Sequence, residues 1–172
     1  MDFNLLIWLF AIAITIHNLE EAIWLPAWSK SAKRWHRPVE PAVFRFAVLV
    51  LTLFAYITAF LASVGGRESL GAYLVTGYAL AMLLNVAFPH LIATAALRRY
   101  APGLVTALLL NLPLTFLVLR QAILEKYIHL SVFIWSGPLV VVCILGSIPV
   151  LFALGRWILR NTIKNKTPST IA

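Results

Sequence analysis

The residues with the greatest chemical capacity lie in one short stretch, His17-Asn18-Leu19-Glu20-Glu21. Apolar residues surround this stretch, from Phe3 to Ile16 before it and from Ala22 to Leu25 after it. Residues three and four positions apart share one face of a helix, so a helix here directs one imidazole and two carboxylates toward one place. Ionisable side chains inside an apolar segment are costly in a membrane and indicate a functional site.

A second polar set, containing Asn85 and His90, lies in a later apolar segment. With Glu20 or Glu21, the imidazoles of His17 and His90 would supply the nitrogen and oxygen ligands that suit zinc or another divalent transition metal. Three protein ligands leave a coordination position for water, as a catalytic metal requires. We therefore predict that His17, Glu20, Glu21 and His90 are metal ligands, and that the first three also form the catalytic set.

Two alternatives to a metal site stay open at this stage. Two carboxylates and two imidazoles in a low dielectric could act as acid and base without a metal. The same groups could instead form a structural network in which His17 and His90 bridge the carboxylates, with Arg45 completing it, since buried polar networks can fix a fold without reacting.

Five further side chains are expected to lie around this set: Arg45, Asn85, Tyr100, Thr106 and Asn111. Arg45 could neutralise a carboxylate, and Asn85 could either orient His90 or form a hydrogen bond between helices. Tyr100 could equally anchor the chain at the membrane interface, and Glu21 could extend toward the headgroups. Pro102 and Gly103 are expected to form a turn.

The two remaining histidines are not expected to belong to the site. His36 lies in a basic, tryptophan-containing loop and is expected to be solvated. His129 is expected on the opposite side of the membrane from the HxxEE stretch.

These two polar sets resemble the signature of the bacterial membrane-protein family that is named for its HXXEE motif. His17, Glu20 and Glu21 match the first block, and the second block is matched by Asn85, His90, Tyr100-Ala101-Pro102-Gly103 and Thr106. The resemblance extends from about Leu6 to Pro113. The family is one of unknown function, so the resemblance implies the fold and the choice of residues but no activity.

The composition is that of a polytopic membrane protein, with 62% hydrophobic and 12% charged residues and a mean hydropathy of +0.91. We predict an all-α bundle forming a single domain over residues 1–172. At about 20 residues per span, the five expected transmembrane helices cover roughly 4–28, 42–64, 70–97, 104–124 and 130–154. A basic, polar tail over 156–172 is expected to fray. Met1-Asp2 lacks the basic start of a signal peptide, so we expect the first helix to be retained.

The distribution of basic residues predicts the orientation. Of the 14 Lys and Arg residues, only Arg67, Arg120 and Lys126 fall on the side opposite to the first loop and the tail. The positive-inside rule then places the N-terminus outside and the C-terminus in the cytoplasm, in a bacterial inner membrane. Because the basic residues lie between apolar runs, we interpret them as topology determinants and expect no nucleic-acid partner.

This topology brings the two polar sets to one depth. The first and third spans both run inward, and a rise of about 1.5 Å per residue places His90 roughly 10 Å from the cytoplasmic end, within the layer occupied by His17 to Glu21. The outer halves of the spans are nearly apolar, which favours a blind pocket over a channel.

We therefore expect a membrane-embedded enzyme that acts on an apolar or amphiphilic, lipid-soluble small molecule. A small transporter, a proton relay or a ligand-binding protein with a structural His/Glu network is the alternative. The chain has only four histidines, too few for a membrane di-iron desaturase, and it contains no Gly-rich phosphate loop, CxxC pair or GxSxG elbow.

Overall fold

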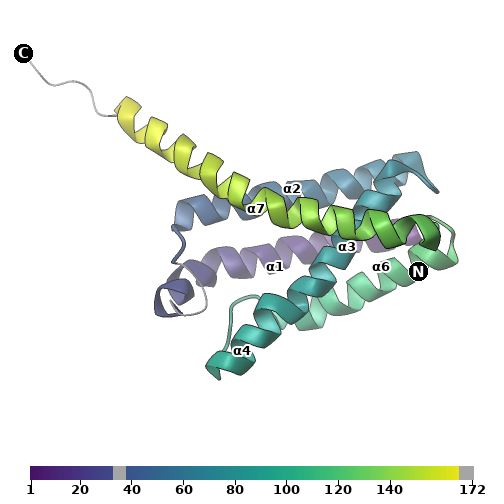
Figure 1. Ribbon diagram of the computed structural model, residues 1–172, viewed down its shortest axis with the longest axis horizontal. Coiled ribbons are helices and arrows are strands. Elements are labelled where there is room, and N and C mark those ends of the chain that lie inside the picture. Colours follow the sequence, from purple (N-terminus) through teal and green to yellow (C-terminus); the bar gives the residue numbers. More distant parts are fainter. Residues whose placement is uncertain (33–37, 167–172) are drawn as a thin grey trace, which may run out of the picture.

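The computed structural model describes residues 1–32 and 38–166, and every regular element in these ranges is a helix (Figure 1). Five helical segments are long and apolar enough to cross a membrane: Phe3–Ser31, Pro41–Gly65, Leu70–Leu97, Leu104–Leu124 and Leu130–Thr162. The predicted all-helical fold is therefore confirmed, and the number of helices long and apolar enough to span a membrane equals the number of predicted spans. The first four predicted spans begin and end within three residues of these segments.

The last helix is longer than the predicted last span. Helix α7 (Leu130–Lys166) continues well past Leu154 into the basic segment that was expected to fray. Arg, Lys, Leu and Ile have good or moderate helix propensity, and no proline follows Pro149 within the helix, so nothing in the local sequence stops it. The rest of the predicted tail, residues 167–172, lies outside the described residues.

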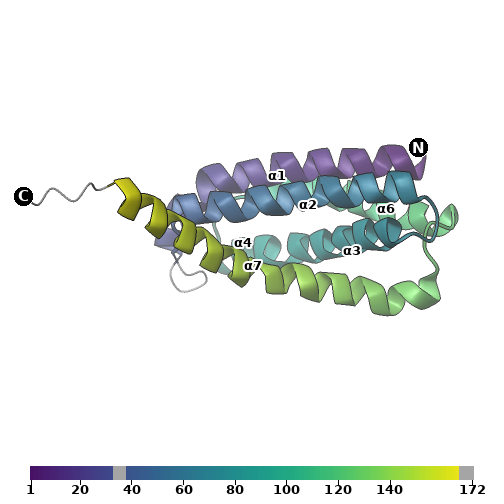
Figure 2. The same ribbon diagram turned by 90° about the horizontal axis from the view of Figure 1, so that it is seen from above.

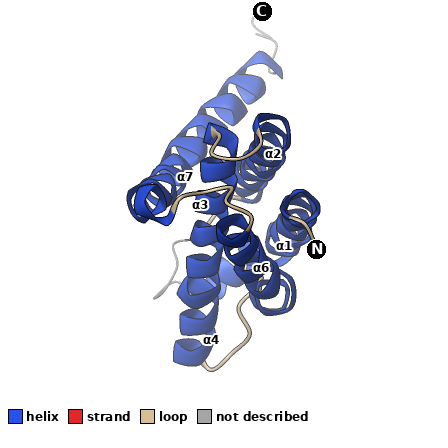
Figure 3. Cartoon of the chain, turned by 90° about the vertical axis from the view of Figure 1, so that its right-hand side faces the viewer, coloured by secondary structure: helices blue, strands red, loops and turns tan. Residues whose placement is uncertain are grey.

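Four helical segments form the bundle, and α7 covers one side of it (Figures 2 and 3). Helix α1 (Phe3–Ser31) packs against α2 (Pro41–Gly65) and α6 (Leu112–Leu124), and α3 (Leu70–Asn85) packs against α2, α6 and α7. In lipid, close packing rather than transfer from water holds helices together, so small residues are favoured at the contacts. At Gly77 a Cβ would stand 2.5 Å from that of Val140, and this glycine lets α7 approach α3.

The apolar core occupies the N-terminal half of α1. Phe3, Ile7, Phe10 and Ile14 are fully buried there, together with side chains of α2, α3 and α6. Asp2 fixes the start of the helix, since its carboxylate accepts the backbone N–H of Leu5 at 2.7 Å. The HxxEE residues follow this core directly, so the polar set begins where the apolar packing ends.

The third of the long apolar segments is broken near its end, at Pro89. Helix α3 ends at Asn85, a π-helical stretch η1 (Val86–Leu91) follows, and α4 (Ile92–Leu97) departs from the bundle (Figure 1). Proline has no N–H for the helix, and Phe88 before it has an extended backbone with φ −131° and ψ 122°. The break places His90 at the bundle interior, where it is 1% exposed.

A tight connection returns the chain from α4 to the bundle. Arg98 ends α4 with φ 50°, and Gly103 begins α5 (Leu104–Thr106) with φ 93°. A second π-helical stretch, η2 (Ala107–Asn111), leads from α5 into α6. We call residues 98–103 the α4–α5 loop. It lies against α1 at the level of the HxxEE residues.

Candidate functional site

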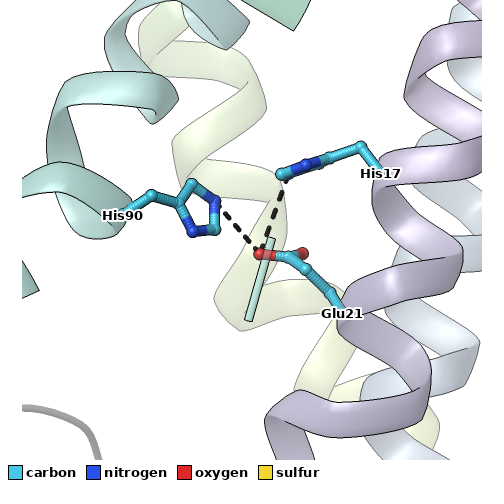
Figure 4. Close-up of side chains that lie close together, drawn as sticks. All are labelled: His17, Glu21 and His90. Atoms are coloured by element: carbon cyan, nitrogen blue, oxygen red, sulfur yellow. Dashed lines mark ion pairs between the residues drawn. The ribbon is translucent and has the colours of Figure 1, made fainter. Parts of the chain in front are cut away.

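Three side chains from two separate segments converge in the bundle. His17 and Glu21 point from α1 toward His90 of η1 (Figure 4). Glu21 Oε1 lies 3.3 Å from His90 Nε2 and 3.8 Å from His17 Nε2, and one ligand atom from each residue lies within 4.8 Å of the others. The two imidazole rings meet edge to face, with centroids 5.0 Å apart. We call His17, Glu21 and His90 the triad.

The hydrogen bonds around His17 determine which of its nitrogens faces the triad. Nδ1 lies 2.9 Å from Thr106 Oγ1, and that hydroxyl donates to Glu20 Oε2 at 2.6 Å. The other acceptor near this hydroxyl, the carbonyl of Gly103, is more distant at 3.2 Å and uncharged. Because a hydroxyl has one proton and gives it here to a carboxylate, its oxygen accepts the proton of His17 Nδ1–H. Nε2 is then unprotonated and faces Glu21.

This nitrogen lacks a hydrogen-bond partner. His17 is 1% exposed, and its Nε2 is buried with no hydrogen-bond partner among the described residues. A buried polar atom without a partner is costly and calls for an explanation such as an ion. An unprotonated imidazole nitrogen whose other nitrogen is held by a hydrogen bond is the usual form of a metal-ligating histidine.

Glu20 has a different role from Glu21. The Tyr100 hydroxyl and the Gly103 N–H, the latter at 2.8 Å, donate to Oε1; the Thr106 N–H at 3.3 Å and its hydroxyl at 2.6 Å donate to Oε2. A carboxylate has about four acceptor positions, so protein donors occupy all of them. Glu20 therefore ties the α4–α5 loop and α5 to α1, and the structure places it outside the triad.

Tyr100 is a hydrogen-bond donor in this arrangement. Its partial burial and its hydrogen bond to Glu20 raise the pKa of the Tyr100 hydroxyl to about 12. The hydroxyl therefore keeps its proton at neutral pH. Tyr100 contacts Glu20 rather than serving only as an interface anchor, although its side chain is 47% exposed.

Gly103 packs directly against both histidines, although from the sequence it was expected only to form a turn. A Cβ at this position would lie 2.4 Å from His90 Cε1 and 3.0 Å from His17 Cε1. Only glycine allows the backbone this close to both imidazoles, and its N–H also reaches Glu20. The Pro-Gly pair indicated a turn, and nothing in the sequence indicated that the turn packs on the histidines.

The other predicted residues differ in whether they contact the triad. Asn85 Oδ1 lies 3.0 Å from His90 Nε2, where the amide can orient that ring. Asn111 is fully buried, and neither atom of its amide has a hydrogen-bond partner among the described residues. Arg45 was expected to neutralise a carboxylate. It is instead exposed and donates from Nε to the carbonyl of Ala22 at 3.2 Å, because its side chain lies along the outside of α1.

His129 lies away from the triad. His129 Nε2 is 2.9 Å from Glu68 Oε1, and both side chains are more than half exposed at the end of the bundle that holds the N-terminus. His36 lies outside the described residues.

A small cavity of about 160 Å³ lies next to the triad. Among the described residues of its wall, His90 is the only ionisable one, and the others are mainly apolar: Leu25, Trp28, Phe88, Pro89, Ala93, Ala101 and Pro102. The cavity therefore brings apolar surface directly to one imidazole of the triad.

Five helices that are long and apolar enough to cross a membrane, with a buried His/Glu set between them, are typical of a helical membrane protein. Within that class, the chain belongs to the family described as "Protein of unknown function with HXXEE motif", whose model matches residues 8–118. This range contains the triad, Glu20 and the α4–α5 loop, and it confirms the resemblance seen in the sequence.

One curated relative is similar over nearly the full chain. The uncharacterized protein YrkK of Bacillus subtilis (strain 168) is 42% identical over 146 residues, which cover 85% of this chain and 92% of the relative. No solved structure matches the chain.

Proposed function

We propose that this protein is a metal-dependent, membrane-embedded enzyme that acts on an apolar or amphiphilic small molecule. One observation carries the proposal: the unpartnered Nε2 of His17 faces Glu21 Oε1 and His90 Nε2 within a buried space. Two imidazole nitrogens and one carboxylate oxygen are a ligand set that zinc and other divalent transition metals accept, with a coordination position left for water or substrate.

The residues of this chain would hold and orient the ion. Glu20 and Thr106 fix the His17 ring through Nδ1, so this ring would be held in place as a ligand. Asn85 Oδ1 contacts Nε2 of His90, the nitrogen that faces Glu21, so this amide oxygen would have to leave Nε2 when an ion binds. A bound divalent ion would supply Lewis acidity and lower the pKa of a bound water. Glu21 would be both a ligand and the carboxylate closest to the reacting group. The apolar wall beside His90 would exclude bulk water.

The shape of the site supports a lipid-soluble substrate and a blind pocket. The cavity at His90 is apolar, and the fully buried cluster around Phe10 and Ile14 lies directly beyond His17 along α1. This apolar cluster lies between the triad and the end of the bundle that holds the N-terminus. This arrangement therefore supports a reaction in a blind pocket at the triad better than it supports transport or proton relay across the whole membrane.

We also propose an orientation with the N-terminus outside and the C-terminus in the cytoplasm of a bacterial inner membrane. In the part of the chain that the structure describes, the basic residues other than Arg67, Arg120 and Lys126 belong to the segments at the end of the bundle nearest the triad. The Bacillus subtilis relative supports a bacterial membrane. The site would then open toward the cytoplasmic leaflet.

Elemental analysis of the purified protein tests the proposal. After incubation with zinc and removal of unbound ion, we expect about one equivalent in the parent and almost none in His17→Ala or His90→Ala. His129→Ala is the matched control, because it removes an imidazole from an exposed pair with Glu68 and should retain the metal. A fully folded parent that binds no zinc, manganese, iron or cobalt would rule the metal-dependent mechanism out.

A further inference from the structure

A second concave site lies on the outer surface of the same region, between α1 and the α4–α5 loop. It is an open groove of about 880 Å³, within the range of roughly 300–1,000 Å³ that small-molecule sites occupy. Ile16, Leu19, Ile23 and Trp24 of α1 form one wall, and Val105 forms part of the other. All five side chains are 45–58% exposed, so the groove presents hydrocarbon to whatever occupies it.

The groove is apolar along its length and basic at one end. Ile16 and Ser31 mark its extent along α1, a distance of about 22 Å at 1.5 Å per residue. This length exceeds half of the roughly 30 Å hydrocarbon core, so a groove that begins at the headgroup level would reach the middle of the bilayer. Arg99 and Ser31 lie at the headgroup end, where Arg99 Nη2 donates to Ser31 Oγ at 2.8 Å.

The charge at this end lacks a counterion. Arg99 is exposed, and no carboxylate of the described residues lies within ion-pair distance of it. Glu20, also in the groove wall, is occupied by four donors from Tyr100, Gly103 and Thr106. A ligand that complements this groove therefore has one long apolar part and one anionic end.

We propose that the groove binds an anionic single-chain amphiphile, with its hydrocarbon chain along α1 and its charged head at Arg99. A long-chain fatty acid is the simplest molecule of this chemistry. The assignment deepens the proposed function by naming a substrate class, and it rests on that function only for the step from ligand to substrate. Tyr100 and Thr106 belong to both the groove wall and the hydrogen bonds that hold Glu20 and His17, so the ligand would lie against the support of the triad.

Photolabelling with a fatty acid that carries a diazirine in mid-chain tests the groove directly. The probe is added to the full-length protein in detergent micelles, and labelled residues are mapped by mass spectrometry. We expect saturable labelling of α1 between Ile16 and Trp28, displaced by unlabelled hexadecanoic acid. Labelling that is not saturable and spreads equally over α7 would overturn the proposal, because it would report general contact with lipid.

Two pairs of variants separate the chain from the headgroup. Val105→Trp should fill the groove and abolish the saturable labelling, whereas Leu109→Trp, one turn further on and outside the groove, should not. Arg99→Gln should weaken binding about fivefold at low salt, the size expected for one exposed ion pair, and Arg98→Gln should leave it unchanged. Equal effects within either pair would contradict the assignment.

The chemistry of the ligand is tested with two competitors. The methyl ester of hexadecanoic acid should compete about fivefold less well than the acid in the parent, and equally in Arg99→Gln, because it lacks the charge. Phosphatidylglycerol, which has two chains, should compete poorly. If it competes as well as the acid, the single-chain assignment is wrong.

Metal content separates this inference from the proposed function. Val105→Trp and Arg99→Gln should keep the metal content of the parent, since neither residue contacts the triad. If the parent binds metal but shows no saturable labelling of the groove, only the inference about the groove is refuted. If the groove is labelled but the parent binds no metal, only the proposed metal chemistry is refuted.

Discussion

Gly103 lies so close to His90 that a Cβ on the glycine would stand 2.4 Å from Cε1 of the imidazole. At Gly103 the backbone of the α4–α5 loop therefore packs directly against the triad. The N–H of Gly103 also donates to Glu20 at 2.8 Å. One residue therefore sets both the position of the histidine and the position of the loop.

Gly103→Ala should displace both imidazoles and abolish metal binding. The substitution adds a methyl group where none fits. The fold also requires φ +93° at this position, which alanine adopts at a cost of roughly 1–3 kcal/mol. Gly66→Ala is the matched control, because Gly66 also has a positive φ, +70°, but a Cβ there meets nothing within 4 Å. Thermal unfolding should show a loss in both variants, and elemental analysis should show loss of metal only in Gly103→Ala. Normal metal content in Gly103→Ala would show that the contact with His90 is unimportant.

Glu20→Gln should lower the stability of the protein, whereas Glu21→Gln should abolish zinc binding. In Glu20→Gln the new side-chain amide cannot accept from all four donors, so denaturant unfolding in detergent should show a loss of about 3 kcal/mol. Among the described residues, the ion-pair partners of Glu21 are the two histidines of the triad. Because glutamine keeps the size and the hydrogen-bonding capacity of Glu21, this replacement should change the stability of the metal-free protein by less than about 1 kcal/mol, while zinc binding fails. Equal destabilisation by both changes would contradict the division of roles.

Tyr100→Phe should weaken the attachment of the α4–α5 loop and remove one pH dependence of stability. A hydrogen bond to a charged group contributes about 1.5–3 kcal/mol, and the variant should lose an amount at the lower end because the side chain is half exposed. The pKa of the folded Tyr100 is raised to about 12, above the ordinary value near 10. Its contribution is therefore complete below about pH 10 and is lost as the pH rises toward 12. Unfolding curves across this range should fall for the parent and fall less for Tyr100→Phe.

The sequence predicts the fold well because the lengths of the apolar runs and the positions of the prolines determine local structure. The five spans follow from runs of hydrophobic residues, and the break beside His90 follows from Pro89. The end of α7 was missed because the polar residues after Leu154 mark the edge of the membrane, which does not coincide with the end of the helix.

The site was predicted as a group of residues, but their individual roles were not. Spacing along α1 places Glu20 and Glu21 next to each other, so the sequence treats them as equivalent ligands. What separates them is a contact across the bundle: Tyr100, Gly103 and Thr106 all bind Glu20. Such contacts depend on the backbone path of the α4–α5 loop, which propensity and periodicity do not specify.

Reporter fusions test the orientation. A cytoplasm-active reporter placed after Ala172 should be active, and a periplasm-active reporter at the same position should be silent, because most basic residues of the described ranges lie at the end of the bundle nearest the triad. A sandwich fusion at Gly66, in the turn between α2 and α3, should give the opposite pattern. The reverse result at both positions would place the site in the other leaflet.

The last prediction separates a site kept for function from one kept for stability. Removing one member of a buried polar set leaves the others without partners, so His17→Leu alone should destabilise the metal-free protein by about 3–5 kcal/mol. Adding Glu21→Met, His90→Leu and Asn85→Leu removes the remaining polar partners and should restore stability to, or about 1–4 kcal/mol above, that of the metal-free parent. Natural sites sacrifice stability for function, so this apolar variant should also bind no zinc. Thermal unfolding with and without zinc measures both effects, since zinc should stabilise the parent and leave the apolar variant unchanged. If the fourfold variant is less stable than His17→Leu, the triad holds the fold together, and the enzyme proposal should be abandoned for a structural role.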